Sequence, residues 1–473
     1  MKNITTTFLN SILNKEQTVH KTEDILEWIQ QRNQEVRVSI NEIPFNRLKA
    51  WYINKETGNI HHESGKFFSI EGVHIKLNDS KNLKKWSQPI INQPEIGYLG
   101  FLVKKINGVL HFLVQAKIEP GNVNNVQLSP TIQATRSNFS RVHKGKAPTY
   151  LEYFVEKRGR VIIDQLQSEQ GARFFRKRNR NIIIEVEEEI PPHEDFRWMT
   201  LGQIKELLKN DNVVNMDTRT VISGISYGNF NSETVSFIQS FLQKNLSEYS
   251  QNLLVSYVSE DGAFYSMNDL QSWLTELKSK YELQVKLIPI NTVNDWVTTS
   301  HKIHQKDHKY FEVIAVDVEI ENREVARWNQ PIIKPVHEGI VAFIIKKING
   351  IYHCLVQAKL EVGNLDIVEL APTVQCITGN YRKGENEYEV PFLDYVLNAR
   401  KEQIMQDVML SEEGGRFYRN QNRNMVILAE NSFDEKLPEN YTWMTLNQIM
   451  QFMQHNNYVN IEARSLLSVL SFE

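Results

Sequence analysis

Side chains suited to general acid–base chemistry gather in one stretch of the N-terminal half of the chain. Lys117 and Glu119 stand two residues apart in a strand-like segment, so their side chains share one face of the strand. A lysine and a glutamate at this spacing either act on a common ligand or form a structural ion pair, and both readings stay open. His143, Glu152 and Tyr153 follow, with a loop histidine and a core tyrosine as the plainer readings. We predict that these five residues form the catalytic set.

The same stretch carries a stripe of short, neutral polar residues. Residues 114–118 and 126–134 alternate apolar with polar side chains, which predicts strands with one apolar face and one polar face. The polar members of the stripe are Gln115, Gln127, Ser129, Thr131 and Gln133. A solvated sheet face more often carries long charged residues. We therefore interpret the stripe as the wall of a ligand cleft, with a solvated sheet face as the alternative.

Residues able to bind an anion or a sugar surround the stripe. The predicted ligands outside it are Asn122, Arg136, Ser137, Asn138, Arg141 and Tyr150. An arginine can hold a diphosphate with two hydrogen bonds, and an aromatic ring can stack on a nucleobase. The plainer reading of Tyr150 is a buried aromatic with one solvated end.

Common cofactor motifs are not found in the sequence. It has no glycine-rich phosphate loop after a strand, no paired cysteines or His-Glu-x-x-His spacing, and no nucleophile elbow. Cys354 and Cys376 occupy apolar positions of their segments, which favours buried structural thiols. We expect an activity that needs neither a metal nor a nicotinamide cofactor.

The chain matches itself at an offset of about 242 residues, which is too long for a solenoid unit and indicates two copies of a whole domain. The matched strings include residues 104–108 with 346–350, 114–117 with 356–359, 168–171 with 411–414, and 198–201 with 443–446. A turn-rich segment at 223–231 separates the copies, so we predict a first copy at 1–225 and a second copy at 226–473.

Each copy mixes helix and strand patterns. Residues 24–29 and 269–274 place apolar side chains at helical spacing, and the centre of each copy is strand-like. We expect an α+β fold in which each copy is a curved mixed sheet flanked by helices. The ligand residues predicted in the second copy are Lys359, Glu361, Asn364, Thr373, Gln375 and Tyr395.

Composition narrows the functional class. The 473 residues hold 54 Lys and Arg against 57 Asp and Glu, so no long-range field favours nucleic acid. The basic run at 176–180 is read as a solvated turn, with a phosphate-contacting loop as the alternative. No segment is apolar enough to span a membrane and no signal-like stretch opens the chain, so we expect a cytoplasmic protein.

Several strings resemble the NDP-hexose 2,3-dehydratases of deoxysugar biosynthesis. They cover residues 62–68, 115–124, 126–139 and 166–171 of the first copy, and 370–376 and 411–417 of the second. The resemblance implies a homodimer of subunits with two Nudix-like domains, each able to hold a nucleotide. It implies dTDP-4-keto-6-deoxyglucose as the substrate and a downstream NADPH-dependent 3-ketoreductase as a pathway partner.

Two alternatives are a Nudix-type nucleotide-sugar hydrolase and a non-catalytic nucleotide-sugar binding protein. The metal-binding string Arg-Glu-x-x-Glu-Glu of Nudix hydrolases does not occur, which disfavours the hydrolase.

The two copies also differ from each other. Without a gap, Arg136, Ser137, Arg141 and His143 align with Thr378, Gly379, Lys383 and Glu385. A carboxylate repels a diphosphate and lysine is a poorer clamp than arginine. We therefore expect turnover in the first copy.

Overall fold

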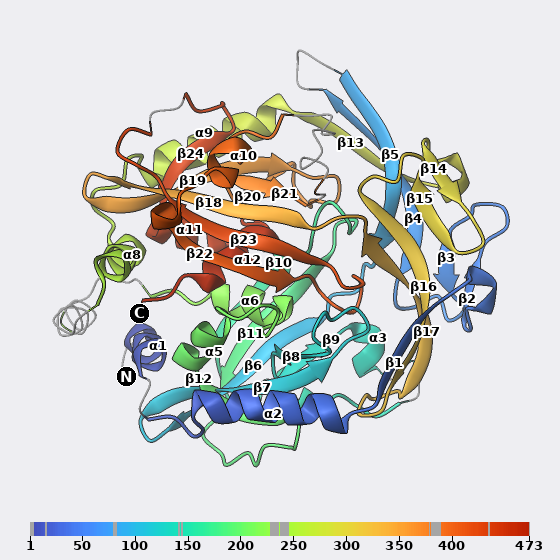
Figure 1. Ribbon diagram of the computed structural model, residues 1–473, viewed down its shortest axis with the longest axis horizontal. Helices are drawn as coiled ribbons and strands as arrows, with labels where there is room; N and C mark the ends of the chain where they lie inside the picture. The colour runs from blue at the N-terminus through green and yellow to red at the C-terminus, as the bar shows by residue number, and fades with distance from the viewer. Residues whose placement is uncertain are drawn as a thin grey trace.

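The computed structural model describes residues 4–14, 17–78, 83–140, 142, 145–227, 236, 246–377, 379, 389–433 and 436–472. The predicted α+β fold with two repeated units is confirmed, because the elements of the second copy follow the order of the first (Figure 1). The expected helices lie in α2 (Thr22–Glu35) and α9 (Met267–Lys280).

The other elements of the first copy are α1 (Ile4–Leu13), β1 (Val38–Ile43), β2 (Trp51–Ile53), β3 (Ile60–His62), β4 (Ser69–Asn78), β5 (Leu83–Asn92), β6 (Tyr98–Ile106), β7 (Val109–Ile118), β8 (Val126–Ser129), β9 (Ile132–Ala134), α3 (Arg136–Phe139), α4 (Leu151–Val155), β10 (Arg160–Ser168), β11 (Arg178–Glu185), β12 (Phe196–Thr200), α5 (Leu201–Leu207) and α6 (Met216–Ser223).

Those of the second copy are α8 (Glu248–Val258), β13 (Glu282–Ile288), β14 (Trp296–Thr298), β15 (Lys302–Gln305), β16 (Phe311–Ile320), β17 (Arg327–Pro335), β18 (Gly339–Ile348), β19 (Ile351–Leu360), β20 (Val368–Ala371), β21 (Val374–Cys376), α10 (Leu393–Leu397), β22 (Ile404–Ser411), β23 (Gln421–Leu428), β24 (Tyr441–Thr445), α11 (Leu446–Met453) and α12 (Ile461–Val469).

Each copy contributes a large mixed sheet. The first runs β10-β11-β6-β7-β12, with β8 on β7 and β9 on β6, and the second repeats this order with β22-β23-β18-β19-β24. Within them β11 pairs with β6, and β23 with β18, in parallel. Ile182, Ile183 and Ile184 in β11 are all fully buried, as expected for a central strand covered on both faces.

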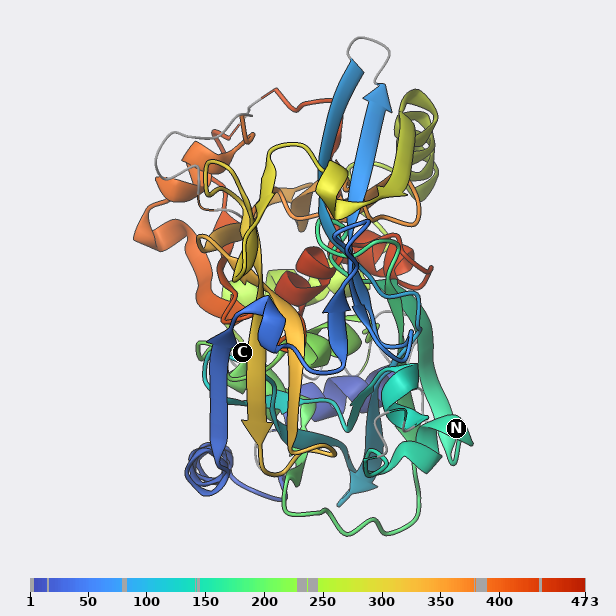
Figure 2. The same ribbon diagram turned by 90° about the vertical axis from the view of Figure 1, so that its right-hand side faces the viewer.

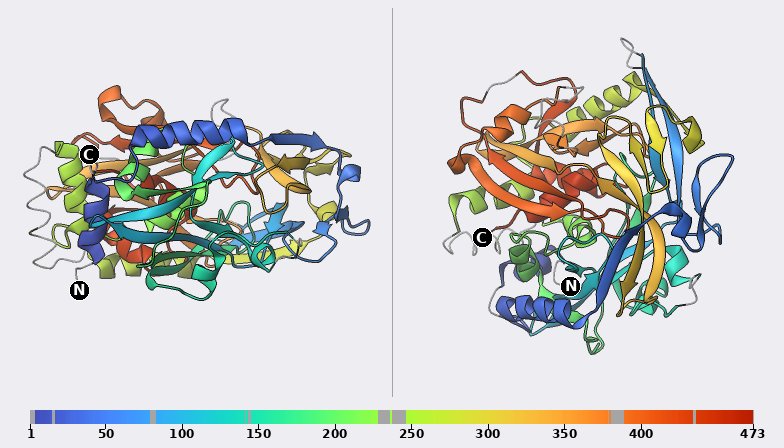
Figure 3. Two further views of the ribbon diagram at one scale, coloured as in Figure 1. Left: turned by 90° about the horizontal axis from the view of Figure 1, so that it is seen from below. Right: turned by 45° about the vertical axis from the view of Figure 1, so that its right-hand side comes forward.

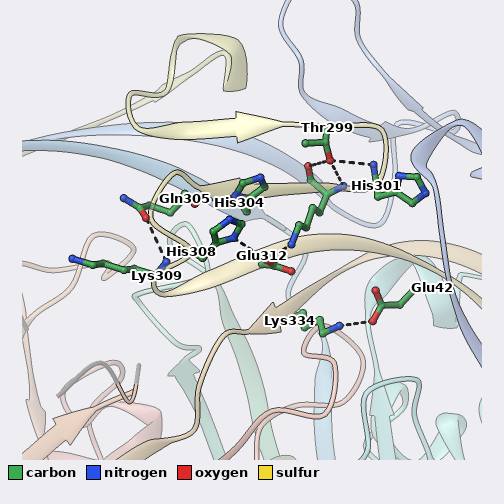
Figure 4. A network of polar contacts seen from close by, with 10 residues as sticks. Glu42, Thr299, His301, His304, Gln305, His308, Lys309, Glu312 and Lys334 are labelled. Atoms are coloured by element: carbon green, nitrogen blue, oxygen red, sulfur yellow. Dashed lines mark hydrogen bonds and ion pairs between the residues drawn. The ribbon is translucent and has the colours of Figure 1, made fainter. Parts of the chain in front are cut away.

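The two copies exchange their first strands. Strand β1 of the first copy pairs with β16 of the second, and β13 of the second pairs with β4 of the first (Figures 1 and 2). Lys334 donates to Glu42 and adds a polar tie between β17 and the exchanged β1 (Figure 4). Neither small sheet is complete without the other copy.

Helices α6 and α12 pack against each other at the centre of the molecule, between the two large sheets (Figure 1). The two small sheets lie at the opposite end from α1 and α8 (Figure 3). The copies therefore meet both at a helix pair and at interleaved strands.

The expected strand at 126–134 is wrong as a single element. It divides into β8 and β9 around Pro130, whose ring removes a backbone donor. Thr131 accepts a hydrogen bond from Leu102 N at 3.0 Å and donates to Leu113 O at 2.5 Å. Its side chain serves the sheet itself, and most of the predicted polar stripe is buried rather than exposed to a cleft.

Candidate active site

A cavity lies where the two copies meet. First-copy side chains in its wall include Trp51, His62, Phe68, Lys117, Glu119, Gln133, Asn138, Glu169, Lys177, Asn179 and Asp217. Second-copy side chains in its wall include Arg323, Trp328, Gln330, Glu413 and Arg416. Both copies are needed to build this one cavity.

A close backbone crossing brings the second copy into the cavity. Gly121 N donates to Gly414 O at 2.7 Å, and Arg419 N donates to Gly121 O at 2.8 Å. A Cβ atom at position 121 would stand 1.6 Å from the Phe417 carbonyl oxygen, so only glycine fits here. The loop that carries Glu413 and Arg416 is thereby fixed beside the end of β7.

Lys117 and Glu119 converge on Gln133. Lys117 Nζ donates to Gln133 O at 3.0 Å, and Gln133 Nε2 donates to Glu119 Oε1 at 3.0 Å. The other Glu119 oxygen is buried and has no hydrogen-bond partner within the described part of the chain. Burial lowers the pKa of Lys117. The two side chains form no direct ion pair, and both face the cavity.

Two carboxyl groups from different copies share the cavity. Asn179 Nδ2 donates to Glu169 Oε1 at 2.7 Å, and Gly415 N donates to Glu413 Oε1 at 3.0 Å. Burial raises the pKa of Glu169, while the positive charges of Lys177 and Arg464 oppose that rise. Burial and the Glu119 carboxylate raise the pKa of Glu413 to about 8. Burial thus favours the protonated form of both carboxyl groups, and only at Glu169 do two neighbouring cations, Lys177 and Arg464, oppose it.

Lys177 and Asp217 add a base and an acid whose pKa values are also perturbed. Lys177 Nζ donates to Asn179 Oδ1 at 2.7 Å and also to Glu95 O. Burial lowers the pKa of Lys177 to about 8. Burial raises the pKa of Asp217 well above its usual range, and its Oδ1 has no partner in the described structure. Perturbed titratable groups of this kind gather at functional sites.

Aromatic and cationic groups form the rest of the wall. The Arg416 guanidinium lies over the Phe68 ring at 4.1 Å, and the Trp51 ring packs against Phe68 at 4.7 Å. Arg323 Nη1 donates to Ile118 O at 3.0 Å. The cavity therefore offers aromatic faces together with two guanidinium groups.

The predicted site residues of the first copy fall into four groups. In the cavity wall are Lys117, Glu119, Gln133 and Asn138. Not in that wall are the buried Asn122, Gln127, Ser129, Thr131, Ser137 and Tyr150 and the half-buried Gln115 and Tyr153. Arg136 and Glu152 are exposed. Arg141 and His143 lie outside the described residues.

The buried residues are engaged within the protein. Ser129 Oγ donates to Gln133 Oε1 at 2.9 Å, and Gln127 Oε1 accepts from Ser411 at 2.9 Å. Ser137 N donates to Glu95 at 2.9 Å. Tyr150 OH donates to Pro191 O at 3.2 Å and accepts from His193 N at 3.1 Å.

The local arrangement recurs in the second copy. Lys359 Nζ donates to Gln375 O at 3.2 Å, and Gln375 Nε2 donates to Glu361 Oε1 at 3.1 Å. Thr373 repeats the contacts of Thr131, with Ile344 N and Leu355 O. The remaining predicted residues also bind protein groups: Asn364 donates to Lys359 O, and the Tyr395 hydroxyl accepts from Gln403.

Two of the differences between the copies concern the second carboxyl group and the lysine of the cavity. Aligned on the strings that begin at Ser168 and Ser411, Glu413 answers Gln170 and Lys177 answers Asn420. Gln170 donates to Glu412, the counterpart of Glu169 in the second copy. An amide therefore stands beside Glu412 where a carboxyl group, Glu413, stands in the cavity of Glu169. The first-copy cavity alone therefore combines the second carboxyl with the buried lysine.

Sequence reasoning missed Glu169, Lys177, Asp217, Glu413 and Arg416. The repeated Ser-Glu-Gln/Glu-Gly string was a usable signal for the two glutamates, because it sets carboxyl groups before a glycine turn in both copies. The interpretation of 176–180 as a solvated turn is wrong at Lys177, which is 4 % exposed.

Comparisons with known proteins identify the family of the chain. The sequence model of the family described as NDP-hexose 2,3-dehydratase matches residues 22–225 and 267–470, that is, α2 to just past α6 and α9 to just past α12. The chain belongs to the NDP-hexose 2,3-dehydratase family. Its two matched regions are the two copies, so the cavity between them lies within the family's repeat.

Curated relatives match this chain over nearly its whole length. It is similar to a dTDP-4-dehydro-6-deoxy-alpha-D-glucopyranose 2,3-dehydratase of Saccharopolyspora spinosa, 44% identical over 99% of this chain and 95% of the relative. Proteins of the same description from Amycolatopsis orientalis and Streptomyces violaceoruber are each 42% identical, over 95% and 93% of this chain and 90% and 95% of their own lengths.

Two further findings concern the described residues of this family member. None of its helices is long and apolar enough to cross a membrane. No group of three or more His, Cys, Asp or Glu side chains among them is arranged to hold a metal ion.

Proposed function

We propose that this chain removes water from dTDP-4-keto-6-deoxyglucose to give dTDP-3,4-diketo-2,6-dideoxyglucose. The C4 ketone acidifies the C3 proton, so a base can remove it and leave an enolate. Expulsion of the C2 hydroxyl then forms the C2–C3 double bond and restores the C4 carbonyl. The resulting enol tautomerises to the 3,4-diketone. The chemistry needs a base, an acid and donors to the enolate oxygen.

Glu169 and Glu413 supply the base and the acid in this proposal. Burial raises the pKa of Glu169, and the Asn179 hydrogen bond and the charges of Lys177 and Arg464 oppose that rise. Glu413 has a pKa of about 8 and is protonated near neutral pH. Glu169 therefore takes the C3 proton, and Glu413 gives a proton to the departing C2 hydroxyl. Two carboxyl groups in different surroundings thus take opposite roles.

The lysines and arginines bind the rest of the substrate. Lys117 and Lys177 are positioned in the wall as donors to the C4 oxygen as it becomes an enolate. Arg416 and Arg323 suit the diphosphate, and the rings of Trp51 and Trp328 suit the thymine base.

Turnover is assigned to the cavity that holds Lys117, and the observation that carries this is the pair of differences between the copies. Glu413 and Lys177 stand here, whereas Gln170 and Asn420 take their places in the second copy. The second copy keeps Lys359, Glu361 and Gln375 in the same contacts, which supports binding of a nucleotide there. Its role is binding, regulation or assembly.

The domain type, the oligomeric state, the cell compartment and the pathway partner are proposed from the family resemblance. The two copies are Nudix-like domains, the subunit pairs as a homodimer, and the enzyme works in the cytoplasm. Its diketone product passes to an NADPH-dependent 3-ketoreductase.

Incubation of the purified protein with dTDP-4-keto-6-deoxyglucose, with and without EDTA, tests the function. Mass spectrometry is expected to show loss of one water at a rate that EDTA does not change. Metal-dependent release of a nucleotide would instead identify a Nudix-type hydrolase. Saturable binding with no change of mass would identify a binding protein.

A further inference from the structure

Arg464 on α12 is an arginine buried without an ion pair. Its side chain is 1 % exposed, and none of the ion pairs among the described residues involves it. It donates from Nε to Thr220 Oγ1 at 2.7 Å, from Nη1 to Val459 O at 2.6 Å and from Nη2 to Ser168 O at 2.5 Å. Burying a cation without an ion pair is costly, and these three protein acceptors offset part of that cost.

The third of these contacts reaches the proposed base. Ser168 directly precedes Glu169, and the Glu169 backbone N–H donates to Lys177 O at 2.9 Å. The Ser168 hydroxyl donates to Glu369 at 2.6 Å. The peptide that carries the Glu169 side chain is therefore held on both sides, and Arg464 supplies one of the holding contacts from the other copy.

Arg464 also acts through its charge. Its guanidinium favours the ionised form of Glu169 and so opposes the effect of burial on the pKa of that carboxyl. The same residue thus fixes the position of Glu169 and favours the protonation state that a base requires.

Arg219 on α6 repeats this arrangement for the second copy. It is 1 % exposed and donates to Ser465 Oγ at 2.8 Å, Val214 O at 2.6 Å and the carbonyl of Ser411. Ser411 directly precedes Glu412, the counterpart of Glu169. Each arginine crosses the α6–α12 contact to support a glutamate of the opposite copy.

We propose that Arg464, although it belongs to the second copy, is a positioning residue for the first-copy cavity. By binding the Ser168 carbonyl it keeps the Glu169 carboxyl in place for proton abstraction. This inference rests on the proposed assignment of turnover to that cavity. Arg219 makes the same contacts in an equally buried place, so it is a structural control that differs in the glutamate it supports, Glu412 instead of Glu169.

Matched Arg464→Lys and Arg219→Lys variants of the full-length protein test the inference by thermal unfolding, kcat, KM and the pH profile of kcat. Both variants are expected to lose similar stability. Arg464→Lys is expected to lower kcat by about 10- to 100-fold with little change in KM, because a displaced base reacts poorly. It should also shift the acidic limb of the kcat profile to higher pH, because the ammonium of the introduced lysine would lie farther from Glu169 than the guanidinium does. Arg219→Lys is expected to keep the wild-type profile.

A milder pair covers the case in which a lysine variant does not fold. Thr220→Val removes the acceptor of Arg464 Nε, and Ser465→Ala removes that of Arg219 Nε. Only Thr220→Val is expected to alter kcat and the acidic limb. Equal effects of the members of a pair on kcat, with unchanged pH profiles, would overturn the inference.

The reverse pattern has a separate meaning. If the Arg219 and Ser465 variants alone alter the profile, turnover belongs to the second copy and the assignment of the reactive cavity fails. Wild-type protein that does not dehydrate the sugar nucleotide at all would instead reject the proposed function.

Discussion

The Gln170 amide donates a hydrogen bond to the Glu412 carboxylate across the boundary between the two copies. Asn422 donates to the other oxygen of the same carboxylate. At the related position beside Glu169, the chain has Glu413 instead of an amide. Beside Glu412 the chain therefore has an amide that satisfies the carboxylate, whereas beside Glu169 it has a second carboxyl group. We interpret the first pair as a structural contact and the second as an acid–base site.

The rate should depend on pH through the two carboxyl groups. Glu413 acts as an acid only while protonated, and its pKa is about 8, so kcat is expected to fall as pH rises through that value. Glu169 acts as a base only while ionised, which produces the acidic limb. Initial rates from pH 5 to 10 check this profile. A rate that keeps rising above pH 9 would contradict the role of Glu413.

Replacing Lys177 by its second-copy counterpart should impair turnover. Lys177→Asn removes a buried donor from the cavity and is expected to lower kcat by about 10²-fold or more, as for loss of one oxyanion donor. The matched variant Asn420→Lys is expected to leave kcat near wild type. Steady-state kinetics of the two variants, measured after folding is confirmed, shows whether only Lys177→Asn lowers kcat. Equal kcat values in both would remove Lys177 from the mechanism.

Stability should fall as pH rises from mildly acidic values. Burial raises the pKa of Glu369 to about 7 and that of Glu413 to about 8, from the ordinary 4.5. A raised carboxyl pKa means that the folded state holds the proton more tightly. The stability that these two protonated groups contribute to the folded state is complete below pH 4.5, and it is lost as pH rises through 7 to 8. Thermal unfolding between pH 5 and 8 measures the change in Tm.

Glu369→Gln provides the control for that titration. A glutamine oxygen can still accept from the Ser168 hydroxyl, which lies 2.6 Å from Glu369. The variant is expected to show a weaker decline of Tm with pH than wild type. An unchanged decline would mean that this carboxyl does not titrate in the window.

Nucleotide binding should show two sites per chain. Arg416 lines the first-copy cavity, and its counterpart Arg173 lies over the Phe311 ring at 4.2 Å in the second copy. Calorimetry with dTDP is expected to give a stoichiometry of two in wild type. Arg416→Lys should weaken one site and raise KM, whereas Arg173→Lys should weaken the other and leave KM unchanged. No binding at all would refute the nucleotide assignment.

Sequence reasoning reached the parts of the site that depend on local pattern. Alternation at and just beyond the end of β7 predicts Lys117 and Glu119 on one face, and the structure has both in the cavity with Gln133. Alternation alone does not distinguish a cavity wall from a buried sheet contact, so it also selects Ser129 and Thr131, which bind protein groups.

The rest of the site depends on contacts between the copies. Glu413 and Arg416 reach the first-copy cavity through the Gly121 crossing, and β1 pairs with the distant strand β16, as in Val38 with Ile320. A repeat predicts two similar domains but contains no local signal for an exchange of strands between them. Such long-range pairing is determined by the whole packed structure.

The most direct test is kcat of Glu413→Gln beside Gln170→Glu, both measured with dTDP-4-keto-6-deoxyglucose. Glutamine is similar in size to glutamate and occupies the related place as Gln170, so Glu413→Gln should remain folded. Loss of a working acid is expected to lower kcat by about 10²–10⁴-fold. Gln170→Glu should stay within a few-fold of wild type. Wild-type kcat in Glu413→Gln would contradict the claim that the first-copy cavity, completed by the second copy, carries out the dehydration.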